Sequence, residues 1–265
     1  MTAQLVLLDL DGTLYQAGTP VPGAAEAVAR LRADGHTLRF FTNTDSQATS
    51  ALLARIRGLG FEAEADELFT PVVAARRILG ASPGRRALLL VSEAVRDELG
   101  TTCDVLPLDQ AGQASHVIIG DFRDGLCYEA LDAAYRAVRG GAQLVALQVG
   151  RYFRAKDGPH MDTGAIVAAV EYAAEATALV LGKPSPEFLG QAVASAPEAF
   201  PAGATWVVGD DRSTDIAMAI RAGLRSVQPR TGKHDDQAGR ADLPVPEYVI
   251  DSVAVLPELL SGGAV

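Results

Sequence analysis

Two aspartates at the end of an apolar run are the first residues whose types and spacing could do chemistry. Asp9 and Asp11 follow Leu5–Leu8 in the sequence Asp9-Leu10-Asp11-Gly12-Thr13. Carboxylates at positions i and i+2 point to the same side of an extended chain. Two like charges at a strand end are costly unless they share a cation or a proton. The pair is therefore a candidate reactive site, although solvated turn acids would give the same pattern.

Polar residues follow three further apolar runs in the same way. They are Thr42 and Asn43 after 38–41, Lys183 after 178–181, and Asp210, Asp211 and Asp215 after 206–209. Taken singly, each has a plain structural explanation as a helix cap, a surface lysine or a set of turn acids. Ligands of open α/β sheets bind beyond the carboxyl ends of the strands. The recurrence predicts one site at one edge of one sheet.

These residue types fit phosphoryl transfer. A carboxylate can attack phosphorus and form an aspartyl-phosphate, and a second carboxyl can protonate the leaving oxygen and then activate water. A hydroxyl and a lysine can hold the phosphoryl oxygens. Several carboxylates would repel a phosphate dianion unless a cation were present. Ligands that are all oxygen favour Mg²⁺ over zinc.

Short apolar runs and helical patterns alternate along the chain. Buried parallel strands are predicted at 5–10, 37–42, 87–91, 116–120, 143–147, 178–181 and 205–209. Helices are predicted at 23–34, 44–58, 71–80, 128–139, 162–175 and 214–222, and Ser185-Pro186 can begin another. This alternation predicts an α/β fold with parallel sheets and right-handed crossovers.

Composition limits the partners. The 265 residues are 48% hydrophobic and 21% charged, which is ordinary for a globular protein. A net charge of −10 gives no basic footprint for nucleic acid or for an anionic membrane. We see no signal peptide and no apolar stretch long enough to span a bilayer, so a cytoplasmic protein is expected. Cys103 and Cys127 are expected to be unrelated thiols.

The sequence resembles the haloacid dehalogenase (HAD) superfamily. The four motifs of that superfamily occur in order as 9–13, 42–43, 182–186 and 209–215. The resemblance implies that Asp9 is the nucleophile, that Asp11 is the general acid and base, and that Lys183 stabilises charge. It further implies phosphate binding by Leu10, Asp11, Thr42, Asn43 and Lys183, Mg²⁺ binding by Asp9, Asp210 and the carbonyl of Asp11, and support from Asp211 or Asp215.

A narrower likeness concerns the NagD-like (type IIA) subfamily. The sequences at 150–153, 183–188 and 230–233 are similar to it, and most similar to the branch of the phospholysine phosphohistidine inorganic pyrophosphate phosphatases. The resemblance implies a Rossmann-like parallel-sheet core with an inserted α/β cap domain of the C2 type. We predict core at 1–79, cap at 80–178 and core again at 179–265.

The predicted function is that of a Mg²⁺-dependent phosphatase for a small phosphorylated substrate. Alternatives are a phosphotransferase, a dehalogenase, which would not need Asp11, and a non-catalytic protein on the same scaffold. Within the cap, Arg151, Lys156 and Asp162 lie in a polar loop at 148–162 and are candidates for substrate selection. The alternative for Asp162 is a helix N-cap only. A homodimer through the cap is the expected assembly.

Overall fold

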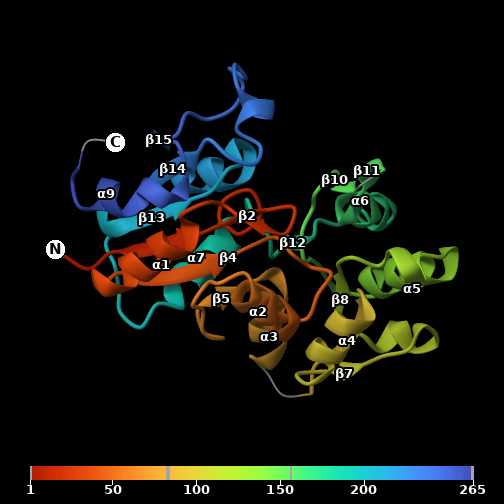
Figure 1. Ribbon diagram of the computed structural model, residues 1–265. Coiled ribbons are helices and arrows are strands. Elements are labelled where there is room, and N and C mark those ends of the chain that lie inside the picture. The colour runs from red at the N-terminus through yellow and green to blue at the C-terminus, as the bar shows by residue number, and fades with distance from the viewer. Residues whose placement is uncertain (1, 82–83, 156, 264–265) are drawn as a thin grey trace. The chain divides into compact units, whose positions relative to one another are not determined.

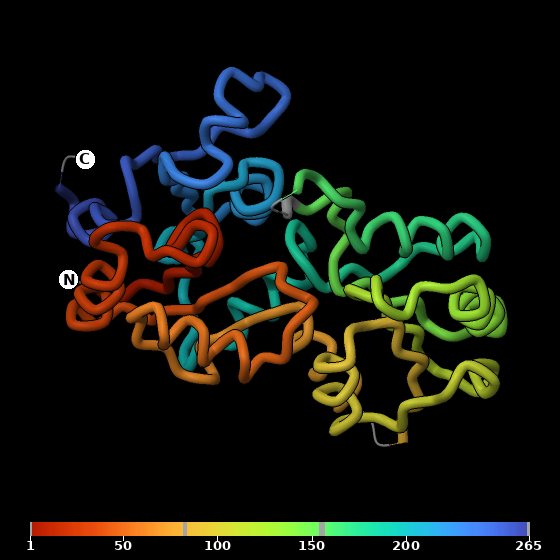
Figure 2. The backbone as a smooth tube through the Cα atoms, turned by 45° about the vertical axis from the view of Figure 1, so that its right-hand side comes forward, coloured from red at the N-terminus to blue at the C-terminus, as the bar shows by residue number. Residues whose placement is uncertain are grey.

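The computed structural model describes residues 2–81, 84–155 and 157–263 of the chain (Figure 1). The chain forms two compact units. The first comprises 1–42, 50–69 and 183–265, so it is built from both ends of the sequence, and the second comprises 43–49 and 70–182 (Figure 2). The predicted cap, 80–178, falls inside the second unit, which also includes 43–49, 70–79 and 179–182.

The first unit is built around a six-stranded parallel sheet in the described chain, in the order β15-β14-β13-β1-β4-β5. Its strands are β1 (Leu5–Leu8), β4 (Thr37–Phe41), β5 (Leu68–Phe69), β13 (Thr205–Val208), β14 (Arg225–Pro229) and β15 (Tyr248–Ile250). Strand β1 lies between β13 and β4, with Leu5 opposite Thr205 on one side and Thr37 on the other. The carboxyl ends of these three strands therefore meet at one edge.

Both faces of this sheet are covered, which is why its strands are continuous apolar runs. The helices of the unit are α1 (Ala24–Ala33), α2 (Thr49–Gly58), α7 (Pro186–Ala194), α8 (Ala217–Arg221) and α9 (Leu256–Leu260). Phe40 belongs to the buried cluster that contains Val28 of α1. Phe41 points to the opposite face, as alternation along a strand requires, and stacks on Phe188 of α7 with ring centroids 5.9 Å apart.

The second unit has its own parallel sheet, in the order β12-β9-β8-β6-β7. Its strands are β6 (Arg86–Leu90), β7 (Asp104–Val105), β8 (His116–Ile119), β9 (Gln143–Ala146) and β12 (Leu179–Val180). Its helices are α3 (Pro71–Gly80), α4 (Glu93–Gly100), α5 (Tyr128–Arg139) and α6 (Thr163–Ala174). Buried alanines of α5 and branched residues of α6 pack with the sheet in one apolar cluster. The predicted α/β class with parallel sheets is confirmed.

Some predictions of local structure were wrong or incomplete. The helix predicted at 44–58 begins only at Thr49, because side-chain hydrogen bonds of Asp45 and Thr49 hold the residues before it in another conformation. The predicted loop 148–162 contains an antiparallel hairpin, β10 (Tyr152–Ala155) and β11 (Gly158–Met161). A smaller hairpin, β2 (Tyr15–Gln16) and β3 (Thr19–Pro20), follows the first motif, and β14 and β15 were not predicted.

None of the helices in the described ranges combines the length and the apolar composition that crossing a membrane requires. The cytoplasmic location stays a prediction.

Candidate active site

Asp9 lies at the centre of the sheet edge. It directly follows β1, and its main-chain N–H donates to the carbonyl of Val208 in β13 at 2.9 Å. Asp210 comes two residues after the end of β13, and Thr42 comes directly after β4. The order of the strands thus brings the first, second and fourth motifs together, as the sequence predicted for this edge.

The two carboxylate oxygens of Asp9 have different partners. The ammonium of Lys183 contacts Oδ1, and the hydroxyl of Thr13 donates to Oδ2 at 3.3 Å. Lys183 Nζ also donates to Asp215 Oδ1 at 2.7 Å and lies 4.5 Å from the centre of the Phe41 ring. Burial alone would lower the pKa of Lys183, but the two carboxylates outweigh burial and raise it. Lys183 therefore remains a cation beside Asp9.

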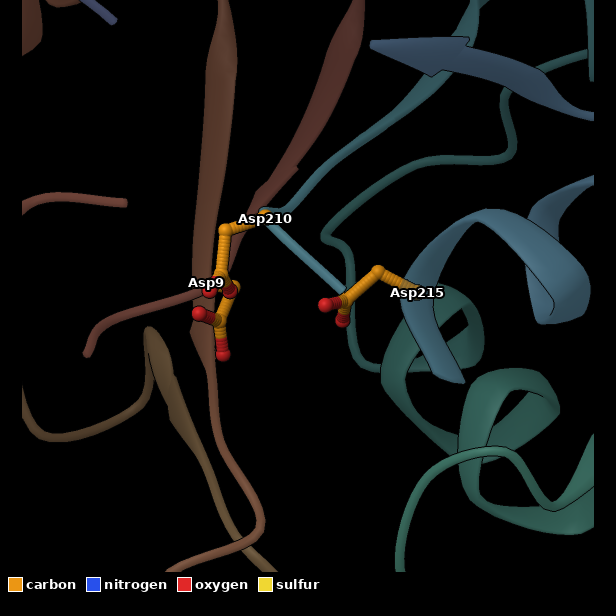
Figure 3. Close-up of side chains that lie close together, drawn as sticks. All are labelled: Asp9, Asp210 and Asp215. Atoms are coloured by element: carbon orange, nitrogen blue, oxygen red, sulfur yellow. The ribbon is translucent and has the colours of Figure 1, made fainter. Parts of the chain in front are cut away.

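Asp9, Asp210 and Asp215 form a buried acidic cluster (Figure 3). One carboxylate oxygen from each lies within 4.8 Å of the others. Burial, with the charges of Asp9 and Asp215, raises the pKa of Asp210 to about 8. Burial raises the pKa of Asp215 to about 6 although Lys183 opposes this rise. Three acids so close together favour a bound cation, and their oxygen atoms suit Mg²⁺.

Asp11 differs from the other acids because its side chain is exposed. Partial burial raises the pKa of the Asp11 carboxyl, and the charge of Asp9 raises that pKa further. The intervening Leu10 is fully buried, and its carbonyl accepts hydrogen bonds from the main chain of 13–15. Any contact of Leu10 with a ligand would therefore come from the main chain. This turn leaves Asp11 accessible while it holds Asp9 in place.

The sequence left open whether Asp211 or Asp215 supports the site. Asp215 bonds to Lys183 and belongs to the acidic cluster. Asp211 has other partners: Ser213 and Gln237 donate to its Oδ1, and Lys233 Nζ donates to its Oδ2 at 2.7 Å. Burial would raise the pKa of Asp211, but Lys233 and the hydrogen bonds lower it instead. Asp211 caps the short π-helical turn Arg212–Ile216 that carries Asp215.

The second motif is divided between the units. Thr42 is buried in the first unit, where its N–H donates to the carbonyl of Phe69 at 3.2 Å. Asn43 is the first residue of the second unit and is half-buried.

The candidates for substrate selection lie in the second unit. Arg151 is exposed in the bend before β10. Asp162 is the N-cap of α6, where it accepts from the N–H of Thr163 at 2.8 Å and from Gln148 Nε2 at 2.9 Å. Lys156 lies outside the described residues. Asp162 therefore does cap α6, as the alternative interpretation predicted.

Residues 231–233 belong to the site but were not assigned a role from sequence. They follow β14, and the main-chain N–H of Lys233 donates to Asp210 Oδ2 at 2.8 Å. A correct prediction of β14 would have revealed them, because Thr231 and Lys233 then follow a strand next to β13.

Comparisons with known proteins agree with the resemblance. Residues 6–102 match the model of haloacid dehalogenase-like hydrolases, and residues 180–256 match a model described as HAD-hydrolase-like. The chain is 36% identical over 232 residues to haloacid dehalogenase-like hydrolase domain-containing protein 2 of Bos taurus (86% of this chain, 85% of the relative). It is 34% identical over 235 residues to the human phospholysine phosphohistidine inorganic pyrophosphate phosphatase (86% and 83%).

Two solved structures extend the likeness to nearly the whole chain. The p-nitrophenyl phosphatase from Archaeoglobus fulgidus aligns with a TM-score of 0.87 and 26% identity, covering 98% of this chain and 100% of that one. NagD from E. coli K-12 aligns with a TM-score of 0.82 and 26% identity, covering 96% and 98%. The predicted NagD-like resemblance is confirmed.

Proposed function

This chain belongs to the haloacid dehalogenase-like hydrolase family, and from that premise we propose that it is a magnesium-dependent phosphatase of a small phosphorylated metabolite. The observation that carries the proposal is the Asp9 carboxylate, held between Lys183 and Thr13 beside two more buried acids. Similar proteins named as phosphatases, the human relative and the archaeal p-nitrophenyl phosphatase, support the reaction class.

In the first step, a carboxylate oxygen of Asp9 attacks the phosphorus of the substrate. A bond forms between phosphorus and that oxygen, and the bond from phosphorus to the leaving oxygen breaks. Asp11 gives its proton to the leaving oxygen, so the leaving group departs as a neutral alcohol. The product on the enzyme is an aspartyl-phosphate. The exposed side chain of Asp11 suits contact with a substrate that arrives from solvent.

In the second step, the carboxylate of Asp11 takes a proton from water while the water oxygen attacks phosphorus. The bond between phosphorus and Asp9 breaks, which regenerates the Asp9 carboxylate and releases inorganic phosphate. Lys183, which contacts Asp9, supplies positive charge to the phosphoryl oxygens in both steps. We propose that Thr42 donates its hydroxyl to the same oxygens and that Asn43 assists.

Asp9 and Asp210, with the main-chain carbonyl of Asp11, would hold Mg²⁺. A bound Mg²⁺ would neutralise charge on the transferred phosphoryl group. Asp215 is the supporting acid nearest to this chemistry, because it orients Lys183.

Rapid acid quenching with p-nitrophenyl phosphate tests the covalent step. Asp9→Asn should form no phospho-enzyme. Asp11→Asn is the matched variant. The p-nitrophenolate group leaves without a proton, so Asp9 should still become phosphorylated. The aspartyl-phosphate should then hydrolyse slowly, because no carboxylate at position 11 activates the water. Phosphate found on Asp9→Asn, or no accumulation in Asp11→Asn together with normal turnover, would contradict the proposal.

We also propose that the second unit acts as the cap and selects the leaving group. Asp9, Asp11, Lys183 and Asp210 all belong to the first unit, so the phosphoryl machinery can recognise only what every substrate shares. Arg151 is the best described candidate because it is exposed, whereas Asp162 is engaged at α6. Arg151→Ala should change the order of kcat/KM across a panel of phosphate esters. Arg139→Ala, also exposed in this unit, is the control and should keep that order.

A homodimer through the cap is proposed as the assembly. Tyr128 of α5 is 77% exposed and Tyr172 of α6 is 90% exposed, and these two helices pack together. Exposed aromatic rings are enriched at protein interfaces. Light scattering after gel filtration should give a dimer mass, and Tyr128→Glu with Tyr172→Glu should give a monomer. A wild-type monomer at micromolar concentration would disprove the assembly.

A further inference from the structure

The carboxylate of Asp210 is enclosed between two glycines from distant parts of the chain. Gly12 and Gly232 have φ angles of +91° and +56°, a region that favours glycine. A Cβ atom on Gly12 would lie 2.3 Å from Asp210 Oδ2, and one on Gly232 would lie 2.0 Å from the same oxygen. The Gly232 Cβ would also lie 2.7 Å from the Cα of Gly12. No side chain other than hydrogen fits at either glycine.

The residues on either side of Gly232 form hydrogen bonds with the turn at Gly12 and with Asp210. The Thr231 hydroxyl donates to the main-chain carbonyl of Gly12 at 2.5 Å. The main-chain N–H of Lys233 donates to Asp210 Oδ2 at 2.8 Å. Residues 231–233 are thus bonded through Thr231 to the turn of the first motif and through Lys233 to Asp210 of the fourth motif.

The ends of this segment are themselves anchored. Before it, the N–H of Arg230 donates to the carbonyl of Ile250 in β15 at 2.8 Å. After it, Lys233 Nζ pairs with Asp211 Oδ2 at 2.7 Å. Asp210 also has its main-chain carbonyl held, because Gln228 Nε2 donates to it at 2.8 Å. Because both ends of the segment are anchored, the Lys233 N–H can hold the Asp210 carboxylate in a fixed position.

We propose that residues 231–233 form a clasp that holds Asp210 against the turn of the first motif, and that Thr231 is a positioning residue for the Mg²⁺ site. This inference rests on the proposed function, since it takes Asp210 as a ligand of Mg²⁺. Thr231 acts through Gly12 and Lys233. Its hydroxyl provides the side-chain bond between the clasp and the Gly12 carbonyl.

Loss of that hydroxyl lets the clasp move away from Gly12, and the Lys233 N–H then no longer fixes Asp210. Groups that orient metal ligands in this way typically contribute ~10- to 100-fold to metal affinity. We expect Thr231→Val to weaken Mg²⁺ binding about tenfold, at the low end because the other anchors remain. The KM measured at saturating Mg²⁺ should change little, since Thr231 bonds the turn and not a predicted phosphate ligand.

Matched variants separate this role from a general loss of stability. Thr231→Ser keeps the hydroxyl and should restore wild-type affinity. Thr205→Val is the control: Thr205 also donates its hydroxyl to a carbonyl, that of Pro201, but it lies at the opposite end of β13 from Asp210. Thr231→Ala repeats the test with a smaller side chain if valine disturbs the turn.

The experiment is calorimetric titration of each purified protein with Mg²⁺ alone, followed by Mg²⁺ titration of p-nitrophenyl phosphate hydrolysis. The inference is supported if the dissociation constant rises about tenfold for Thr231→Val and stays at the wild-type value for Thr231→Ser and Thr205→Val. Equal affinity of Thr231→Val and wild type overturns the inference alone. A wild-type protein that binds no Mg²⁺ overturns the proposed metal requirement together with it.

Discussion

Asp45 should make the stability of this protein fall as pH rises from about 4 to about 7. Its side chain is only 6% exposed and accepts a hydrogen bond from the Thr163 hydroxyl at 2.9 Å. Burial raises the pKa of Asp45 to about 7, from an ordinary 3.8, although the bonds from Thr163 and Gln148 oppose the rise. The charges of Asp162 and Asp121 act in the same direction as burial.

The sign follows from proton binding. Between pH 4 and pH 7, roughly, the folded protein binds the Asp45 proton more tightly than the unfolded chain does, so raising the pH favours unfolding. The pKa difference of about 3 units corresponds to ~4 kcal/mol at about 1.4 kcal/mol per unit. The free energy of unfolding should therefore decline by a few kcal/mol across this window and level off above pH 7.

Urea unfolding of wild type and Asp45→Asn at pH 5 and pH 8 measures this effect. The neutral amide keeps the shape and removes the titration, so the stability advantage of Asp45→Asn over wild type should be larger at pH 8 than at pH 5, by roughly 2–3 kcal/mol. Asp97→Asn, at an exposed aspartate of the same unit, should follow wild type at both pH values. The reasoning fails if Asp45→Asn loses as much stability between pH 5 and pH 8 as wild type does.

Three further outcomes are expected. Asp9→Asn should lower kcat on the order of 10⁶-fold, measured by phosphate release, and more than a tenth of wild-type kcat would refute its role. Exhaustive EDTA treatment should abolish activity and added Mg²⁺ should restore it; full activity in EDTA would disprove the metal requirement. Asp211→Ala should mainly reduce stability, by about 1–2 kcal/mol for a lost helix cap. Asp215→Asn should mainly reduce kcat, because Lys183 loses one of its two carboxylate partners and keeps only Asp9. Urea unfolding and steady-state kinetics separate the two, and equal effects of both variants would contradict this division.

Sequence reasoning located the edge of the sheet because that edge depends on short-range patterns. Apolar runs mark the strands, and parallel strands carry their carboxyl ends to one side, so polar residues after β1, β4 and β13 had to meet. The same reasoning missed β14, since Arg225 and Gln228 interrupt its apolar pattern although Gln228 is buried. With β14 unrecognised, the residues after it could not be placed beside Asp210.

The helix predicted at 44–58 was wrong only in its first residues, since α2 begins at Thr49, and the physical reason is different. Periodicity cannot show that a polar residue is buried by a distant partner. Asp45 reaches Thr163, which is 118 residues away, and Thr49 bonds Glu98 through its hydroxyl at 2.7 Å. Such long-range hydrogen bonds hold 45–48 outside the helix that begins at Thr49, and only the structure reveals them.

The pairing of Lys183 and Lys233 with the acids of the site explains why the neighbouring residues Asp210 and Asp211 have different roles. Lys183 pairs with both Asp9 and Asp215, and Lys233 pairs with Asp211, so these three carboxylates each have a lysine partner. The carboxylate of Asp210 receives a main-chain N–H from Lys233, which orients it without neutralising its charge. A carboxylate that is buried, oriented and close to two others is suited to a cation that arrives from solution. The adjacent Asp211, already paired and capping a helical turn, is suited to holding the backbone that presents Asp215.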